Sequence, residues 1–231
     1  MKRNIKSSIG FTMGATDGDI GAVKDFYFED DSWIVRYLVI ETGSWLNGRK
    51  VLISADALLI PDWKNKTFPI RLTKDQIKNS PDIDTELPVY RQQEIKLYEH
   101  YALGNYWRAG FVAGGMPLPM NDAMTKEDDA ISDKKPDGDL HLRSTNKVTG
   151  YIVAAVDGTI GDVEDFIIDD ETWKLDIIVV NTGIGVLGKK VLVPVKCITE
   201  IKWNISTVII DISTQSVMNS AKYVESELWM I

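Results

Sequence analysis

The fold is decided by a ten-residue stretch that occurs twice in the chain. The first copy is Asp17-Gly18-Asp19-Ile20-Gly21-Ala22-Val23-Lys24-Asp25-Phe26, and the second is Asp157-Gly158-Thr159-Ile160-Gly161-Asp162-Val163-Glu164-Asp165-Phe166. The offset of 140 residues continues without a gap, and 17 of the 42 positions from Met13 to Ser54 are identical to their counterparts. An ungapped match of this length indicates an internal duplication.

Each copy has the pattern of short β-strands joined by tight turns. Asp-Gly pairs are typical of hairpins because glycine tolerates positive φ angles. We therefore interpret six positions as structural turn residues: Asp17, Gly18, Gly21, Asp157, Gly158 and Gly161. After the first turn, apolar side chains alternate between two faces, and Trp33 to Thr42 is apolar enough to cross a core. Five or six such strands in about 60 residues predict a small closed barrel, which leaves no exposed edge.

A short helix is expected after each barrel. Thr73 and Gln76 have the spacing of a capping box, in which each side chain satisfies a backbone N–H at the start of a helix. The second copy keeps Ser213 at the cap position but has Ser216 where the glutamine stood. The sequence therefore predicts a helix in both places, with an incomplete box in the second.

The segment between the copies has no duplicate. Pro88 to Tyr101 predicts a helix with a stripe of tyrosines, which either packs on a barrel or docks a partner. Residues 121–145 are polar and acidic and are typical of an exposed linker. The predicted organisation is a first barrel over 1–80, a connecting helix and acidic loop over 81–148, and a second barrel with a C-terminal helix over 149–231.

Composition excludes several classes of protein. The 231 residues carry a net charge of −8, which argues against broad binding to nucleic acid. No run approaches the roughly 20 apolar residues of a membrane span, and the single cysteine, Cys197, fits a reducing, cytoplasmic compartment. His100 and His141 lack partners at metal-ligand spacing, and no catalytic constellation is found. We expect no metal, no cofactor and no enzymatic activity.

Charge is distributed unevenly along the chain. Residues 1–80 carry 12 basic and 10 acidic side chains, residues 81–149 carry 8 and 12, and residues 150–231 carry 6 and 12. The net charges are therefore +2, −4 and −6. Two barrels of opposite net charge are expected to attract each other, either within one chain or between chains of a homo-oligomer.

Both copies resemble the PRC-barrel, the small β-barrel of the cytoplasmic domain of the photosynthetic reaction-centre H subunit. The resemblance rests on the repeated ten-residue stretch, on Trp33, on Thr42-Gly43 and on Lys50-Val51-Leu52-Ile53, with the matching second set. It covers about 144 of the 231 residues, from 9 to 80 and from 149 to 220. It implies two PRC-type barrels in a mainly β chain, and it implies action through protein contacts, since the family shares no catalytic residues.

The first function hypothesis is a non-catalytic cytoplasmic module that binds protein partners. Its candidate contacts are the three tryptophans with no counterpart in the other copy, Trp45, Trp107 and Trp229, and Tyr98 of the tyrosine stripe. The tryptophans that are paired between the copies, Trp33 with Trp173 and Trp63 with Trp203, are interpreted as core residues. One alternative is assembly linked to the ribosome or to RNA, through Arg3, Lys6, Arg36, Arg49 and Lys50. A photosynthetic electron-transfer role by family analogy, and a small-ligand-binding protein or enzyme, are the remaining alternatives.

Overall fold

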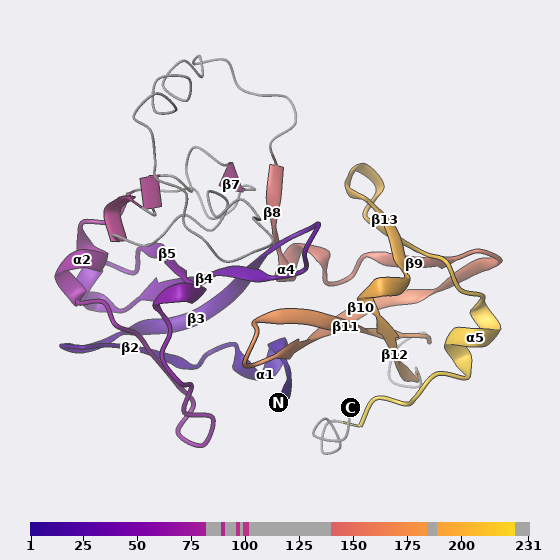
Figure 1. Cartoon of the computed structure of the whole chain (residues 1–231), viewed down its shortest axis with the longest axis horizontal. Coiled ribbons are helices and arrows are strands. Elements are labelled where there is room, and N and C mark those ends of the chain that lie inside the picture. Colours follow the sequence, from indigo (N-terminus) through magenta and orange to yellow (C-terminus); the bar gives the residue numbers. More distant parts are fainter. Residues whose placement is uncertain (82–88, 91–95, 98, 102–139, 184–188, 225–231) are drawn as a thin grey trace, which may run out of the picture.

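The structure is a computed structural model that describes residues 1–81, 89–90, 96–97, 99–101, 140–183 and 189–224. It is mainly β, with two sheets and short helices (Figure 1). We call residues 10–81 the first half and residues 150–224 the second half. Figure 1 shows the first half in indigo to magenta on the left and the second half in orange to yellow on the right.

The first sheet has the strand order β5-β4-β3-β2-β6, with β8 added to β3 and β7 added to β8. Its strands are β2 (Thr12–Ala15), β3 (Gly18–Glu29), β4 (Val35–Thr42), β5 (Lys50–Ser54), β6 (Thr67–Pro69), β7 (Val89–Tyr90) and β8 (Leu140–Ser144). Neighbouring strands are antiparallel except for β2 and β6, which run parallel. In this arrangement most apolar side chains of β3 and β4 are buried in the core.

The second sheet has the order β12-β11-β10-β9-β14-β13, with β1 added to β10. Its strands are β1 (Lys2–Asn4), β9 (Ile152–Ala155), β10 (Gly158–Asp169), β11 (Lys174–Asn181), β12 (Lys190–Pro194), β13 (Ile198–Lys202) and β14 (Thr207–Ile210). Among the described residues, the ladder pairing of neither sheet closes into a ring. The structure therefore shows two sheets, and the two closed barrels stay a prediction.

The two halves exchange their leading segments, which are residues 2–8 and 140–148. The first consists of β1 and α1 (Ile5–Ser8), and it pairs with β10 of the second half. The other consists of β8 and α4 (Thr145–Val148), and it pairs with β3 of the first half. The registers correspond at the 140-residue offset: Asn4 pairs with Ile167, and Ser144 pairs with Tyr27. Residues 2–8, expected to belong to the first barrel, thus pair with the second half. Residues 140–148, expected to belong to the connecting segment, pair with the first half.

The turn before β4 meets the turn before β11 at the centre of the molecule. The Val35 N–H donates to the Trp173 carbonyl at 2.8 Å, and the Leu175 N–H donates to the Trp33 carbonyl at 2.8 Å. Trp33 and Trp173 both have positive φ angles, 61° and 56°. The rings of Phe28 and Phe166 lie 6.0 Å apart between the sheets. One continuous apolar core therefore includes residues of both halves.

The predicted helices are present near the end of each half, as α2 (Lys74–Lys78) and α5 (Thr214–Met218). The capping box of Thr73 and Gln76 is confirmed, since both of its hydrogen bonds are present. Ser213 also caps its helix, by accepting from the Ser216 N–H. Single 3₁₀ turns lie at Ser44–Leu46, Ala55–Ala57, Val195–Cys197 and Trp203–Ile205.

The helix predicted from Pro88 to Tyr101 is wrong at its start. Val89 and Tyr90 form β7, because β8 offers them an antiparallel partner. Residues 96–97 and 99–101 are helical, and there Leu97 and Tyr101 are buried against the first half. The Tyr101 hydroxyl donates to the Leu52 carbonyl at 3.3 Å, and burial raises the pKa of Tyr101 to about 12.

Candidate functional site at the junction of the two halves

Two buried aspartates hold the exchanged leading segments. Asp25 is 8% exposed and Asp165 is 4% exposed. Each lies directly after a β-bulge, between Val23 and Asp25 in β3 and at the equivalent place in β10. An extra residue in one strand reverses the faces beyond it, so the bulge turns the carboxylate toward the other half's leading segment.

Asp25 accepts four hydrogen bonds. Its Oδ1 accepts from the backbone N–H of Phe26 at 2.8 Å, from the Thr145 hydroxyl at 2.9 Å and from the Asn146 N–H at 3.1 Å. Its Oδ2 accepts from the Ser144 hydroxyl. Burial raises the pKa of Asp25, and the four donors oppose that rise. Both oxygens of the Asp25 carboxylate therefore accept hydrogen bonds from the leading segment 140–148.

Asp165 occupies the equivalent place in the second half. Its Oδ1 accepts from the Phe166 N–H at 2.7 Å and from the Lys6 N–H at 3.1 Å. Burial again raises the pKa of this carboxyl, and the two backbone donors oppose the rise. The shared pattern makes these aspartates anchors of the exchange rather than acid or base groups open to a substrate.

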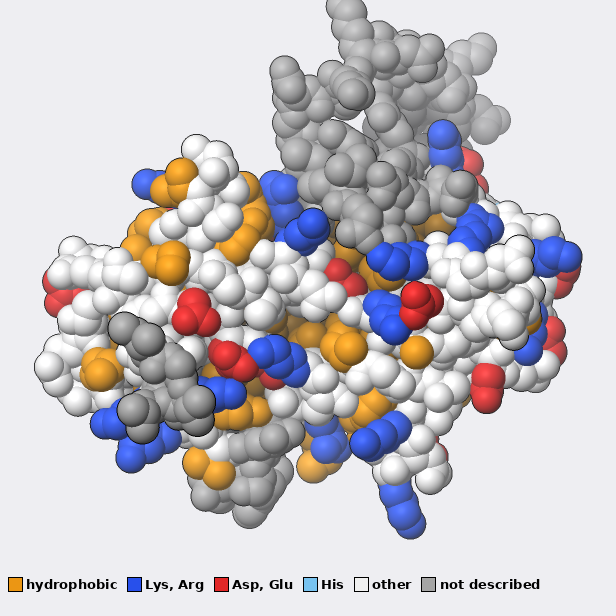
Figure 2. Space-filling model, turned by 180° about the vertical axis from the view of Figure 1, so that it is seen from behind, with side chains coloured by type: hydrophobic (Ala, Val, Ile, Leu, Met, Phe, Trp, Pro, Cys, Tyr) orange, Lys and Arg blue, Asp and Glu red, His pale blue; other side chains and the backbone are white. Residues whose placement is uncertain are grey.

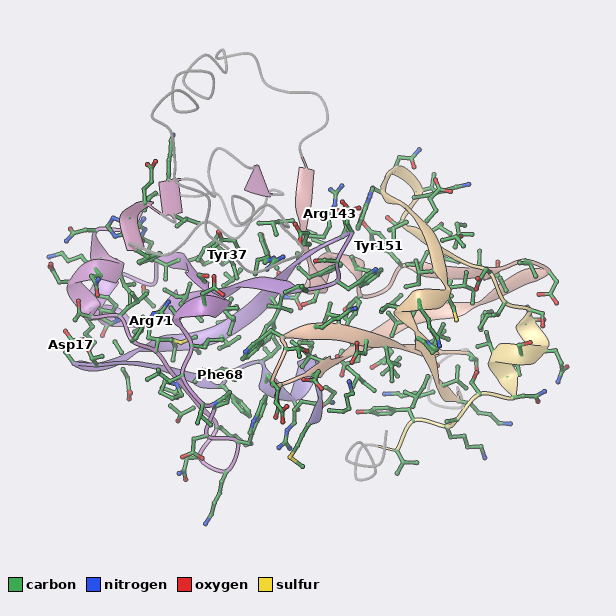
Figure 3. All side chains as sticks on the ribbon, in the orientation of Figure 1. Asp17, Tyr37, Phe68, Arg71, Arg143 and Tyr151 are labelled. Carbon is green, nitrogen blue, oxygen red and sulfur yellow. The ribbon has the colours of Figure 1, made fainter. Side chains whose placement is uncertain are left out.

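Each leading segment also carries an arginine that bridges an aspartate of one half and a tryptophan of the other. Arg143 Nε lies 2.9 Å from Asp30 Oδ2, and its guanidinium lies 4.0 Å from the centre of the Trp203 ring. Burial raises the pKa of Asp30, while Arg143 opposes that rise and Asp31 adds to it. Figure 3 shows Arg143 beside Tyr151, where the two halves meet.

The equivalent bridge joins Arg3 to Asp170 and Trp63. Arg3 Nε lies 3.3 Å from Asp170 Oδ2, and the guanidinium lies 4.7 Å from the centre of the Trp63 ring. All three residues are the counterparts, at the 140-residue offset, of the Arg143 bridge. Paired carboxylate and stacking contacts of this kind suit arginine and not lysine.

A groove opens beside the Arg143 bridge, which we call the junction groove. It encloses about 230 Å³ between the turn that precedes β4 and the edge strand β13. Its lining includes Asp30, Asp31, Trp33, Glu200, Ile201 and Trp203. The lining comes from both halves, so the groove lies where the two halves meet.

Exposed apolar side chains lie close in sequence to Tyr151 and Trp203, whose rings are 6.2 Å apart and of which Trp203 lines this groove. Ile152 is 44% exposed and Ile205 is 59% exposed, and the Ile152 N–H donates to the Ser206 carbonyl at 3.0 Å, so the two lie side by side. Figure 2 shows apolar side chains gathered around the projecting end of β13 and β14, at the upper left. The counterparts in the first half are the polar residues Thr12 and Asn65. The first half has an exposed apolar pair at a different place, Leu59 and Ile60, which correspond to Thr199 and Glu200 of the second half.

A second hollow, of about 320 Å³, lies near Asp165 on the outer side of β10. Its charged side chains neutralise one another, because Lys6 Nζ and Lys190 Nζ lie 2.6 and 3.3 Å from Glu164 Oε1. Lys6 is the main cause of the lowered pKa of Glu164. This self-pairing leaves less charge for a ligand than the junction groove offers.

The uneven distribution of charge along the chain leads to ion pairs between the N-terminal segment and the second half. Lys2 contacts Asp169 and Asp176, and Arg3 and Lys6 contact Asp170 and Glu164. The basic N-terminal segment thus lies on the acidic second half. Asp169 is partly buried, which raises its pKa, but the N–H groups of Thr172 and Glu171 together with Lys2 lower it to about 2.

The basic residues considered for RNA binding are engaged elsewhere. Arg3 and Lys6 pair with acidic groups as described, and Arg36 lies 2.7 Å from Glu29 Oε2. Arg49 donates to the carbonyls of Lys78 and Ser80 at 3.3 and 2.9 Å. Since phosphate binding needs a concentration of uncommitted cations, this pairing weighs against the ribosome or RNA alternative.

Of the four candidate partner contacts, one is described by the structure. Trp45 is partly buried, its indole N–H donates to the Ile20 carbonyl, and Lys74 Nζ lies 5.5 Å from its ring centre. Trp107, Trp229 and Tyr98 lie outside the described residues. The junction groove instead contains Trp33 and Trp203, which their pairing between the copies had indicated as core residues.

The turn residues divide into two kinds. Ala15 pairs with Gly18, so the hairpin loop is Thr16-Asp17, and Asp17 Oδ1 accepts from the Lys74 N–H at 2.9 Å; Asp157 and Thr214 repeat this contact at 2.7 Å. Figure 3 shows Asp17 at the far end of the first half. Gly18 and Gly158 have positive φ angles, 130° and 157°.

Gly21 and Gly161 have a different role, because both lie inside strands. A Cβ atom at Gly21 would lie 2.0 Å from the Glu41 carbonyl oxygen, and one at Gly161 would lie 1.8 Å from that of Asn181. These glycines let neighbouring strands approach closely.

Three further features, metal-binding groups, membrane-spanning helices and similarity to known proteins, assign no function to the described residues. Within the described ranges, no group of three or more His, Cys, Asp or Glu side chains comes together to hold a metal ion. In the same part of the chain, no helix has the length and apolar character needed to cross a membrane. Comparison with protein-family models and with curated proteins finds no match.

Proposed function

We propose that the chain is a non-catalytic protein-binding module built on two duplicated PRC-type barrels, and that the junction groove with its flanking isoleucines is the binding surface. The observation that carries the proposal is the exposed pair Ile152 and Ile205 next to a groove lined by both halves. Apolar side chains grouped beside polar ones are typical of protein-binding surfaces.

The duplicated barrels are supported by the contacts that recur at the 140-residue offset. The aspartate anchors, the arginine bridges and the Trp33 and Trp173 backbone contacts all recur. A non-catalytic role is supported by the use of the buried carboxylates, which are consumed in holding the leading segments. The cytoplasmic location and the PRC resemblance rest on the sequence alone.

The test is photo-crosslinking in the cells that express the protein. The full chain carries a benzophenone amino acid at Ile205 or, as the matched control, at Asn65, which is its counterpart in the first half. We expect a crosslinked protein from position 205 that is absent at position 65. The same products at both positions, or none at position 205, would overturn the proposal.

A further inference from the structure

We infer that the junction groove takes an extended, basic peptide segment of the partner, which pairs with the open edge of β13 and places a lysine or arginine between Asp31 and Glu200. This inference rests on the proposed function and adds the chemistry of the partner. Two observations carry it: the open strand edge and the charges of the groove.

The first observation is the open edge. β13 is the last strand of its sheet, so among the described residues one side of its backbone has no neighbouring strand. Its counterpart in the first half, residues 58–62, contains Pro61 and forms only the isolated bridges Leu58–Ile70 and Asp62–Thr67. Proline prevents an edge from pairing further. β13 contains no proline, and after the bulge between Ile198 and Glu200 its register is regular to Lys202, so this part of the edge can accept an added strand.

The second observation is the charge of the groove. Asp30 is engaged by Arg143, but Asp31 has no cation in contact within the described part of the chain. Glu200 is 59% exposed and meets Lys202 only at 3.9 Å. The groove therefore presents carboxylates that are incompletely neutralised beside the indole rings of Trp33 and Trp203, a setting that attracts cations.

An extended segment fits these features together. Backbone hydrogen bonds to β13 fix its path, and alternate side chains point to the groove. A lysine or arginine on that side meets Asp31 and Glu200, and apolar residues nearby contact Ile201. The same carboxylates repel an acidic peptide or a phosphate backbone.

The probe is an eight-residue peptide of alternating lysine and valine, with a glutamate and valine peptide as its control. Each is titrated into the isotope-labelled full chain at low salt, and amide shifts give both the site and the affinity. We expect the lysine peptide alone to bind, with shifts concentrated in residues 198–202 and at the Trp203 indole N–H. No binding, equal binding of both peptides, or shifts centred elsewhere would overturn the inference.

Substitutions separate the groove from general charge. Asp31→Lys and Glu200→Lys should each weaken binding about tenfold, since a close charge pair becomes a repulsion. Glu171→Lys makes the same charge change as Asp31→Lys at the equivalent position of the other half, and should leave binding within about twofold. Equal losses in Asp31→Lys and Glu171→Lys would overturn the assignment to this groove.

The two proposals fail separately. A specific crosslink from position 205 without binding of the lysine peptide overturns the basic partner and leaves the protein-binding function. Binding of the peptide at β13 without any crosslinked protein overturns the function in the cell and leaves the chemistry of the groove.

Discussion

Asp25 accepts a hydrogen bond at 3.1 Å from the backbone N–H of Asn146, a residue 121 positions further along the chain. The equivalent contact joins Asp165 to Lys6 at the same distance. Each half therefore holds the leading segment of the other through a buried carboxylate.

Replacing either anchor by asparagine should destabilise the whole chain. Asn keeps the size of the side chain but turns one acceptor oxygen into a donor, so Asp25→Asn should lower the free energy of unfolding by about 1–3 kcal/mol. Denaturant unfolding measures the change. Asp31→Asn, an exposed carboxyl in the same half, is the control and should change it by less than about 0.5 kcal/mol. Equal stability of Asp25→Asn and the parent would contradict the anchor role.

Asp25 and Asp165 should make the protein less stable as pH rises above about 4. Burial raises the folded-state pKa of both above the ordinary 3.8, so their contribution is complete below that value and is lost as pH rises through the raised pKa. Unfolding free energies measured between pH 4 and 7 should therefore fall less steeply in the Asp25→Asn, Asp165→Asn double variant. An unchanged slope would contradict the prediction.

Asp169 should act in the opposite direction at lower pH. Its folded-state pKa of about 2 means that its contribution is present above 3.8 and is lost as pH falls toward 2. Lys2→Met removes one cause of the low pKa, so the acid-unfolding midpoint should move to higher pH. Lys64→Met removes a cation from the first half, far along the chain from this contact, and should leave the midpoint in place.

Arg143 should resist replacement by lysine. Arg143→Lys keeps the charge beside Asp30 but loses the planar contact with Trp203, and Arg143→Met loses both. We expect losses of about 1 kcal/mol for lysine and about 2 kcal/mol for methionine, measured by denaturant unfolding. Arg71→Lys is the control and should be neutral. Equal stability of the lysine variant and the parent would show that charge alone matters at this position.

A change in one half should loosen the other. Gly21→Ala forces a Cβ against the Glu41 carbonyl and should cost about 3 kcal/mol, whereas at Gly14 the nearest atom would lie 3.6 Å away, so Gly14→Ala should be mild. Hydrogen exchange followed by mass spectrometry should rise in β10–β12 as well as in β3–β5 of the Gly21→Ala variant. Exchange that rises in the first half alone would show that the halves unfold independently.

The repeated motif predicts the strand pattern and the capped helices because local patterns carry them. The ten-residue stretch identifies β3 and β10, and the Thr73 capping box identifies α2. Period-two alternation predicts a regular strand through Lys24 and Asp25. It gives no sign of the bulge that turns Asp25 into the buried interior. A bulge depends on what lies across the sheet, which one strand does not contain.

The exchange and the junction groove are invisible in the sequence for a related reason. Residues 2–8 and 142–148 share only Arg3 and Arg143 at the 140-residue offset, so the leading segments carry little trace of the repeat. Pairing of Trp33 with Trp173 and of Trp63 with Trp203 indicates core positions, yet Trp33 and Trp203 reach the groove at the rim of that core. The side of a sheet on which a short strand pairs is decided by long-range packing.

The exchange of leading segments also governs the order in which the protein is completed during synthesis. β1 leaves the ribosome early, but its partner β10 ends at Asp169, and the first sheet gains β8 only when Leu140–Ser144 have been made. At roughly 5–20 residues per second, β1 waits about ten to thirty seconds for its strand. From the completion of β3 at Glu29 to that of β8 at Ser144, about half of the chain is made while the place on β3 is unfilled, and a chain that stops before residue 140 leaves that place open.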